Sequence, residues 1–224
     1  MKRLLLPVAG AVLLFAADLS AGSLTGRVAF QTKRGQNPAV NETLVWLEPQ
    51  GNVRVTKRPP AKFQMITRGK LLIPHVLAVP LGSTVEFPND DPISHNLFSL
   101  STANGFDLGL YRKGSGKAHK FDTAGIVNVY CNVHPNMSAV IHVMPTPYYT
   151  FADGTGTWTF ADLPAGRYRV TAWNEQGGTA ESLVDVGPSA AATAALTIDS
   201  RNYRAQSHAN KEGKAYHAPS SREY

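Results

Sequence analysis

The feature of this sequence that most constrains its fold is a series of short stretches in which apolar and polar residues alternate. Alternation with a period of two fits a half-buried β-strand, because successive side chains point to opposite faces of a sheet. Gly, Pro, Asn and Asp separate the stretches, and helical periodicity is nearly absent. The sequence therefore predicts an all-β protein, with strands over residues 24–30, 43–49, 63–67, 75–80, 83–89, 95–100, 118–122, 126–133, 139–144, 156–163, 168–175, 181–187 and 194–199.

The first residues have the composition of an export signal. The basic pair Lys2 and Arg3 precedes an apolar run over residues 4–17, and small residues follow at 20–22. The alternative is an uncleaved membrane anchor, although the run is shorter than the roughly 20 apolar residues that a membrane-spanning helix needs. We predict that residues 1–21 are a cleaved signal peptide, that the mature protein is not stably inserted in a membrane, and that it is periplasmic or secreted.

Charge and cysteine usage narrow the function classes. The 224 residues carry a net charge of +6 and one cysteine, Cys131. Much of the excess charge lies from Arg201 onward, and no basic block is interleaved with aromatic residues, so nucleic acid binding is not expected. In an oxidising compartment a single cysteine has no internal disulfide partner. Cys131 is therefore a buried apolar residue, an intermolecular bridge or a metal ligand.

The chain divides at a proline-bracketed segment, residues 145–147. Residues 22–145 are predicted to form one β-sandwich domain with an N-terminal extension, and residues 146–199 a second, small β-sandwich. From residue 200 to 224 the chain is polar, basic and without periodicity, which predicts a disordered tail.

The residues around Cys131 have the composition of a metal-binding loop. Cys131 shares one face of its predicted strand with Val127 and Val129, so its thiol points inward. The turn-rich sequence NVHPNM places His134 and Met137 beyond the strand end, before the next strand returns. Upstream, His95 begins a strand after the polar turn PNDDPIS. Two imidazoles and a thiolate with a weak axial methionine are the ligands of a blue-copper electron-transfer site.

The segment from residue 69 to 144 resembles the cupredoxin family, of the amicyanin and plastocyanin type. The family pattern is a strand ending in F-x-N, a following H-N pair and a C-x-x-H loop closed by a methionine. In this sequence the pattern is carried by Phe87, Asn89, His95, Asn96, Cys131, His134 and Met137. The gap between the last two is similar to the short ligand loop of amicyanin.

The resemblance implies a Greek-key β-sandwich that holds one type 1 copper. His95, Cys131 and His134 would be the equatorial ligands and Met137 the axial one, and Asn96 would hydrogen-bond the ligand loop. It further implies a non-enzymatic protein that passes single electrons between redox proteins, with His134 at an apolar surface where electrons enter and leave.

Other readings of these residues remain open. Zinc is a weaker choice, because one thiolate and one thioether make a poor zinc set. A dinuclear copper centre would need a second cysteine, and Tyr130 and Asn132 flank Cys131 where histidines would bridge to a second, catalytic copper. An inward thiol is also a poor nucleophile. The alternative functions are a periplasmic copper carrier or storage protein, and an envelope structural or glycan-binding protein with a secondary copper domain.

The second module carries a phrase of the form F-x-D-L-P-A-G-x-Y from Phe160 to Tyr168. It resembles the carboxypeptidase regulatory-like family of prealbumin-type β-sandwiches, which implies a fold over residues 148–199 more than a function. Trp158, Tyr168 and Trp173 would be either core residues or a glycan platform.

The remaining histidines are mostly expected away from the metal. His75 lies on a strand and could approach the copper end. His119 and His142 are expected to be solvated, whereas His208 and His217, in the predicted tail, could bind copper loosely.

Overall fold

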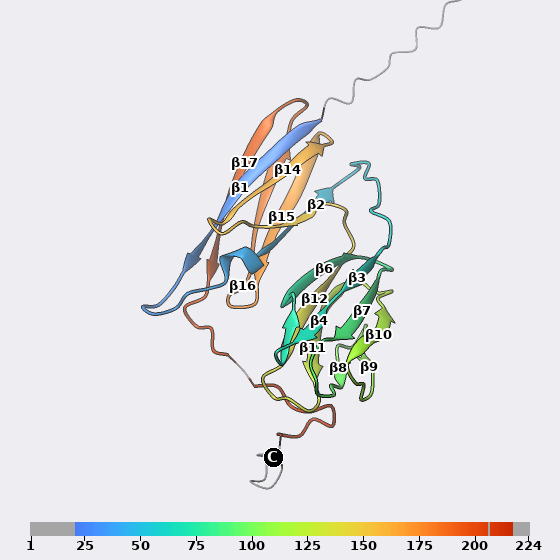
Figure 1. The fold of residues 1–224 in the computed structure, drawn as a ribbon. Coiled ribbons are helices and arrows are strands. Elements are labelled where there is room, and N and C mark those ends of the chain that lie inside the picture. The colour runs from blue at the N-terminus through green and yellow to red at the C-terminus, as the bar shows by residue number, and fades with distance from the viewer. Residues whose placement is uncertain (1–20, 206, 217–224) are drawn as a thin grey trace, which may run out of the picture.

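The computed structural model describes residues 21–205 and 207–216, and these consist of β-strands, loops and one short 3-10 helix (Figure 1). This confirms the all-β prediction. Residues 1–20 of the predicted signal peptide and His217 lie outside the described residues. Within the described ranges, no helix has the length and apolar character needed to cross a membrane.

One sandwich, which we call the inserted sandwich, spans residues 62–144 and has two five-stranded sheets. The first sheet is β10 (Gly114–Lys120), β7 (Thr84–Asn89), β4 (Ile66–Arg68) and β5 (Leu71–Ile73), with β3 (Lys62–Gln64) paired to β7. The second is β6 (Val76–Pro80), β12 (Ser138–Met144), β11 (Gly125–Cys131), β8 (Leu97–Ser99) and β9 (Phe106–Asp107). On β11, Val127, Val129 and Cys131 are buried in the core, as the alternation predicts.

The second sandwich, which we call the flanking sandwich, combines strands from both ends of the chain. Its three-stranded sheet is β14 (Thr157–Leu163), β1 (Gly22–Gln31) and β17 (Ala191–Asp199). Its four-stranded sheet is β13 (Tyr149–Phe151), β2 (Leu44–Gln50), β15 (Gly166–Asn174) and β16 (Gly178–Val186). The 3-10 helix η1 (Val40–Glu42) connects β1 to β2.

This pairing differs from the predicted domain boundaries of 22–145 and 146–199. β1 lies between β14 and β17, and β2 lies between β13 and β15, so the N-terminal strands are middle strands of the flanking sandwich. The inserted sandwich therefore interrupts the flanking one between β2 and β13. Alternation identified β1 and β2 as strands but carries no information about partners more than a hundred residues away, and neighbours in sequence usually pair.

The two sandwiches share an apolar interface (Figure 1). Val76, Val140 and Met144 of the inserted sandwich pack there against residues of the flanking one, among them Trp46 and Trp173. His142 was expected to be solvated because it faces outward on β12. It is instead only 4% exposed, with its ring 4.3 Å from that of Trp173, because the flanking sandwich covers this face.

In the predicted disordered tail, residues 207–216 contact the inserted sandwich (Figure 1), whereas Ser200 donates its N–H to the carbonyl of Gln31 in the flanking sandwich over 3.0 Å. The backbone N–H of Lys211 donates to Asn132 Oδ1 over 2.9 Å, and its ammonium donates to Asp107 Oδ2 over 2.7 Å. The ring of His208 stacks on Tyr130 with 4.4 Å between centroids. The prediction of disorder is thus corrected for residues 200–205 and 207–216, because these long-range contacts cannot be seen in composition.

The aromatic residues considered for a glycan platform lie in the interior. Trp158, Tyr168 and Trp173 are 3%, 0% and 8% exposed, respectively. Tyr168 also donates a hydrogen bond to the carbonyl of Pro164 over 2.7 Å. These rings stabilise the flanking sandwich and its interface, and they do not offer an exposed surface for sugar stacking.

Candidate metal centre

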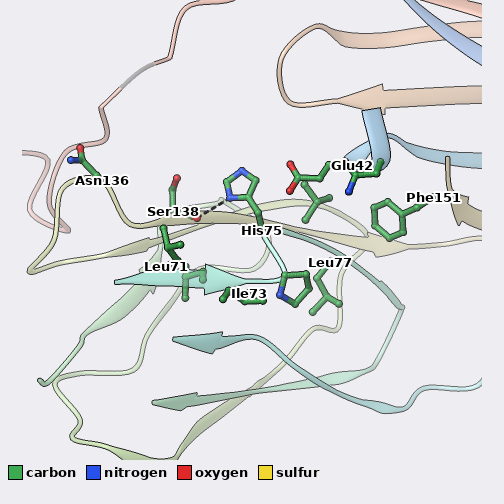
Figure 2. A pocket seen from close by; sticks show the side chains of 12 residues that line it. Glu42, Leu71, Ile73, His75, Leu77, Asn136, Ser138 and Phe151 are labelled. Carbon is green, nitrogen blue, oxygen red and sulfur yellow. Dashed lines mark hydrogen bonds between the residues drawn. The ribbon is translucent and has the colours of Figure 1, made fainter. Parts of the chain in front are cut away.

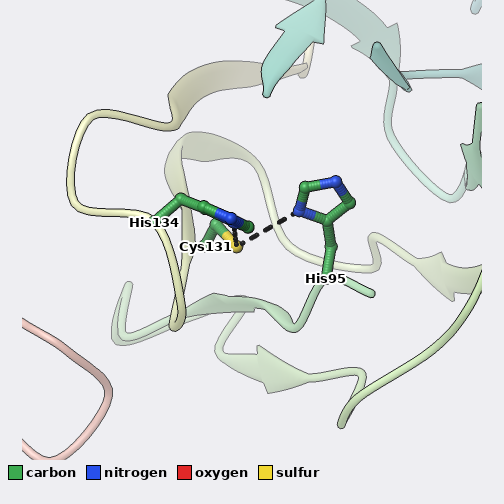
Figure 3. Close-up of side chains that lie close together, drawn as sticks. All are labelled: His95, Cys131 and His134. Atoms are coloured by element: carbon green, nitrogen blue, oxygen red, sulfur yellow. Dashed lines mark hydrogen bonds between the residues drawn. The ribbon is translucent and has the colours of Figure 1, made fainter. Parts of the chain in front are cut away.

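Three of the sequence-predicted ligands meet in one cluster (Figure 3). Cys131 ends β11, His134 follows in the next loop, and His95 lies in the loop between β7 and β8. Their ligand atoms all lie within 4.8 Å of one another. Cys131 Sγ is 3.7 Å from His95 Nδ1 and 3.5 Å from His134 Nδ1.

The loop from Cys131 to Met137 is closed by its own backbone. The N–H of Cys131 donates to the carbonyl of Met137 over 3.0 Å, and the N–H of Met137 donates to the carbonyl of His134 over 3.2 Å. These bonds hold His134 beside the end of β11. Met137 is 1% exposed and belongs to the same core cluster as Cys131.

His95 is fixed at both its backbone and its side chain. Its N–H donates to the carbonyl of Tyr111 over 3.0 Å, and the N–H of Tyr111 donates back over 2.9 Å. On the side chain, Nε2 lies 2.9 Å from Asp91 Oδ2, which leaves Nδ1 as the nitrogen that faces Cys131. The His95 side chain has no exposed surface.

The Cys131 sulfur is shielded from solvent, but several backbone N–H groups can donate hydrogen bonds to it. Burial raises the pKa of the thiol, while backbone hydrogen bonds from Val133, Asn96 and His134 act in the opposite direction. Burial alone would keep the thiol neutral, whereas N–H donors aimed at the sulfur favour the thiolate, the form that binds metals.

His134 is the partly exposed member of the cluster. Burial lowers the pKa of its imidazole, and the nearby ammonium of Lys70 lowers it further. A lowered pKa keeps the ring neutral at neutral pH. The neutral ring has a free nitrogen lone pair, as a metal ligand needs.

Asn96 contacts the ligand loop through its backbone. Its carbonyl accepts a hydrogen bond from the N–H of Asn132 over 2.8 Å. Its side-chain amide donates to Asp107 Oδ1 over 2.6 Å instead of reaching the loop. The amide therefore connects the start of β8 to β9, and Asp107 in turn holds Lys211 of the C-terminal segment.

His75 is not part of the cluster and lies instead in the wall of a groove (Figure 2). Its Nδ1–H donates to the carbonyl of Ser138 over 3.1 Å, and its Nε2 lies 2.5 Å from Glu175 Oε2 of the flanking sandwich. The hydrogen bond with Glu175 raises the pKa of His75. The residue borders a groove of about 840 Å³, with Leu71 and Phe151 also in its wall. His75 therefore acts as a polar contact between the two sandwiches.

Two contacts at the centre were not found from the sequence. Asp91 hydrogen-bonds His95, and Tyr216 donates its hydroxyl hydrogen to the carbonyl of Cys131 over 2.6 Å. The only signal for Asp91 was its place in the polar turn before His95. Tyr216 gave no signal, since it lies in a segment whose composition indicates disorder.

The chain was compared with known proteins. No protein-family model matches it, and no curated protein sequence does either. Among solved structures it is similar to a purple cupredoxin from Nitrosopumilus maritimus, with 26% identity over 37% of this chain and 99% of that chain, and a TM-score of 0.33. An oxidised mutant of amicyanin is 20% identical over 37% of this chain and 81% of that chain, with a TM-score of 0.33.

A copper-containing nitrite reductase from Thermus scotoductus SA-01 is 19% identical over 52% of this chain and 28% of that chain, with a TM-score of 0.35. The first two similar proteins are cupredoxins and the third is an enzyme. Because these TM-scores are below 0.5, it is the donor set of this chain and its geometry that indicate a possible metal site.

Proposed function

We propose that this protein is an exported electron carrier with one type 1 copper, bound by His95, Cys131 and His134 and, axially, by Met137. The observation that carries the proposal is the buried thiol at the end of β11 with two imidazole nitrogens 3.5 and 3.7 Å from its sulfur. Two imidazoles and one thiolate suit copper in both oxidation states. Bound copper would supply a one-electron couple.

The surroundings of the cluster support rapid electron exchange. The closed loop from Cys131 to Met137 and the backbone bridge between His95 and Tyr111 hold the ligands from two sides. Ligands held in this way have little freedom to move when the charge of the metal changes. His134 alone reaches the surface, so it is the point at which we propose that redox proteins exchange electrons with the site.

An enzymatic role at a second copper is less well supported. Tyr130 and Asn132 flank Cys131, and both already contact the C-terminal segment through His208 and Lys211. Neither position offers an imidazole that would bridge from Cys131 to a second metal. We therefore propose a carrier and not an oxidase or reductase, acting in the periplasm or after secretion, without nucleic acid partners.

The decisive experiment is an absorption titration of the mature protein with Cu(II). We expect an intense visible thiolate-to-copper charge-transfer band that saturates at one copper per chain. The variant Cys131→Ser should lose the band. The control His119→Gln should keep it, since His119 stacks on Phe106 outside the cluster. A colourless Cu(II) complex of the wild type would contradict the proposal.

Electron self-exchange separates a carrier from a copper storage protein. A carrier of the proposed type should show a reversible couple and fast self-exchange, because its ligands need not rearrange. A slow and irreversible couple would favour storage. A glycan-binding role has lost its structural support, because Trp158, Tyr168 and Trp173 are buried.

A further inference from the structure

A buried carboxylate lies directly behind one of the proposed copper ligands. Asp91 Oδ2 is 2.9 Å from Nε2 of His95, on the opposite side of the ring from the nitrogen that faces Cys131. Asp91 is 6% exposed and His95 is fully buried. Burying a charged group is costly unless donors compensate it, so the partners of this carboxylate show whether it is charged.

The turn between β4 and β5 supplies these donors. The N–H of Gly69 donates to Asp91 Oδ1 over 2.5 Å, and the N–H of Lys70 donates to Oδ2 over 2.9 Å. Both turn residues have positive φ, 62° and 59°, so the turn presents two successive N–H groups to one acceptor. Such an arrangement of backbone N–H groups is suited to binding an anion.

A second set of bonds fixes the backbone of Asp91. Its N–H donates to Asn89 Oδ1 over 2.9 Å, and the same oxygen accepts a hydrogen bond from the hydroxyl of Thr67 over 2.9 Å. Asn89 and Thr67 have no exposed surface. Asp91 is thus held at its carboxylate by the β4–β5 turn and at its backbone by Asn89 at the end of β7, independently of His95.

The charge state of Asp91 follows from these contacts. Its oxygens face three hydrogen-bond donors, the N–H groups of Gly69 and Lys70 and the ring of His95. These contacts suit an acceptor-only carboxylate, since the O–H of a neutral acid would need an acceptor in the same place. The carboxylate accepts the Nε2–H of His95, which fixes the tautomer whose Nδ1 lone pair is directed toward Cys131.

A negative charge behind a ligand does more than a neutral acceptor would. A carbonyl would orient the ring, whereas a carboxylate also draws the Nε2 proton toward itself and increases the electron density on Nδ1. That effect stabilises a doubly charged metal more than a singly charged one.

We propose that Asp91 is a positioning residue whose carboxylate, anchored by the β4–β5 turn, orients His95 and biases the metal centre toward Cu(II) over Cu(I). This inference rests on the proposed copper function.

The test is Asp91→Asn in the full mature protein, with Asp90→Asn as the matched control. Asparagine keeps the shape and one acceptor oxygen but removes the charge. Asp90 is the adjacent residue, and its carboxylate pairs with Arg68 at the surface and has no bond to His95. Each variant removes one negative charge from the same turn, so a general charge effect would appear in both.

We expect Asp91→Asn to weaken Cu(II) binding by about ten-fold or more, the range typical of residues that support a metal ligand, while Cu(I) binding changes much less. The reduction potential should rise, by about 59 mV for each ten-fold change in the ratio of the two affinities. Asp90→Asn should leave both quantities at the wild-type values. Equal potentials in the two variants, or equal losses of Cu(I) and Cu(II) affinity in Asp91→Asn, would overturn the charge bias.

Two further measurements keep this result separate from the copper assignment. If the wild type gives no charge-transfer band, the proposed function fails, and Asp91 is then judged by Zn(II) affinity. A loss of Zn(II) affinity in Asp91→Asn but not in Asp90→Asn supports the positioning role, and equal affinities overturn it.

If Asp91→Asn does not fold, NMR of the metal-free wild type tests the hydrogen bond between Asp91 and His95 directly. A slowly exchanging, downfield Nε2 proton on His95 supports the hydrogen bond, and a Nδ1-protonated ring overturns it.

Discussion

At the scale of single residues, burial determines the chemistry of several titratable side chains. Burial raises the pKa of the Cys131 thiol, and backbone N–H donors oppose part of that rise, whereas for His142 burial acts without any opposing contact. Among the described residues, His142 Nε2 has no hydrogen-bond partner, and its ring lies between those of Trp46 and Trp173. Burial lowers the pKa of His142 to about 4. The interface between the sandwiches is therefore built around a neutral imidazole.

We predict that His142 makes the metal-free protein sensitive to acid. In the unfolded chain the imidazole of His142 has a pKa near 6.5, whereas in the folded chain its pKa is about 4. Between these two pH values only the unfolded chain binds the proton, so the contribution of His142 to stability is complete above pH 6.5 and falls as the pH drops toward 4. The full loss amounts to about 3 kcal/mol, for a pKa lowered from 6.5 to about 4. Urea unfolding at several pH values should show this decline, and His142→Phe should reduce it.

The measurement at pH 8 provides the reference for this variant, because the imidazole is neutral there in both states. The difference between wild type and His142→Phe at pH 8 reports packing alone, and its change with pH reports the titration. Parallel pH profiles for the two proteins would contradict the prediction.

At the scale of elements, the sequence was sufficient where the structure depends on local periodicity. The inward face of β11 and the turn after it could be predicted, and with them the positions of Cys131 and His134. Contacts between segments that are distant in sequence could not be predicted. Asp91 accepts hydrogen bonds from the β4–β5 turn, and Tyr216 donates one to the carbonyl of Cys131. Neither alternation nor residue spacing identifies these partners.

The C-terminal segment gives a prediction at this scale. Lys211→Met combined with Tyr216→Phe removes an exposed ion pair with Asp107 and the hydrogen bond to the carbonyl of Cys131. The hydrogen bond alone contributes about 1 kcal/mol, which corresponds to a roughly five-fold larger open population, so a non-specific protease should cleave the segment about five-fold faster. The control is Lys214→Met, because the bond that holds Lys214 in place is donated by its backbone N–H. Equal cleavage rates in the double variant and the wild type would show that these bonds do not hold the segment.

At the scale of the whole molecule, one sandwich interrupts the other. The inserted sandwich has its own core, which includes Phe87, Phe121 and Ile141. The flanking core combines Leu24 and Leu47 from the N-terminal strands with residues that follow the insertion. The sequence predicted both sandwiches but assigned β1 and β2 to the wrong one, since only the three-dimensional pairing shows that they are middle strands.

This organisation predicts how pieces of the chain behave. Residues 59–145 should fold alone, because all strands of both their sheets are present. Residues 146–199 should remain unfolded, because without β1 and β2 their strands lose their central partners. Circular dichroism and the dispersion of amide NMR signals would distinguish the two outcomes. As a control, a chain in which a short Gly/Ser linker replaces residues 51–145 should fold, since β2 and β13 are paired neighbours. A folded 146–199 fragment would contradict the assignment.

The insertion between β2 and β13 also restricts how the candidate metal centre can move. Trp46 on β2 pairs with Tyr149 on β13, and Thr146 donates a hydrogen bond to the carbonyl of Leu47 over 2.7 Å. The chain therefore leaves the flanking sandwich at the end of β2 and re-enters it at β13, directly beside β2. The inserted sandwich has two connections to the flanking one, residues 51–61 and 145–148, and the interface that includes Trp46, Val140 and Trp173 adds a further attachment that limits rotation. For a molecule bound to the flanking sandwich, the distance and orientation of His134 relative to that molecule would therefore be nearly the same in every complex.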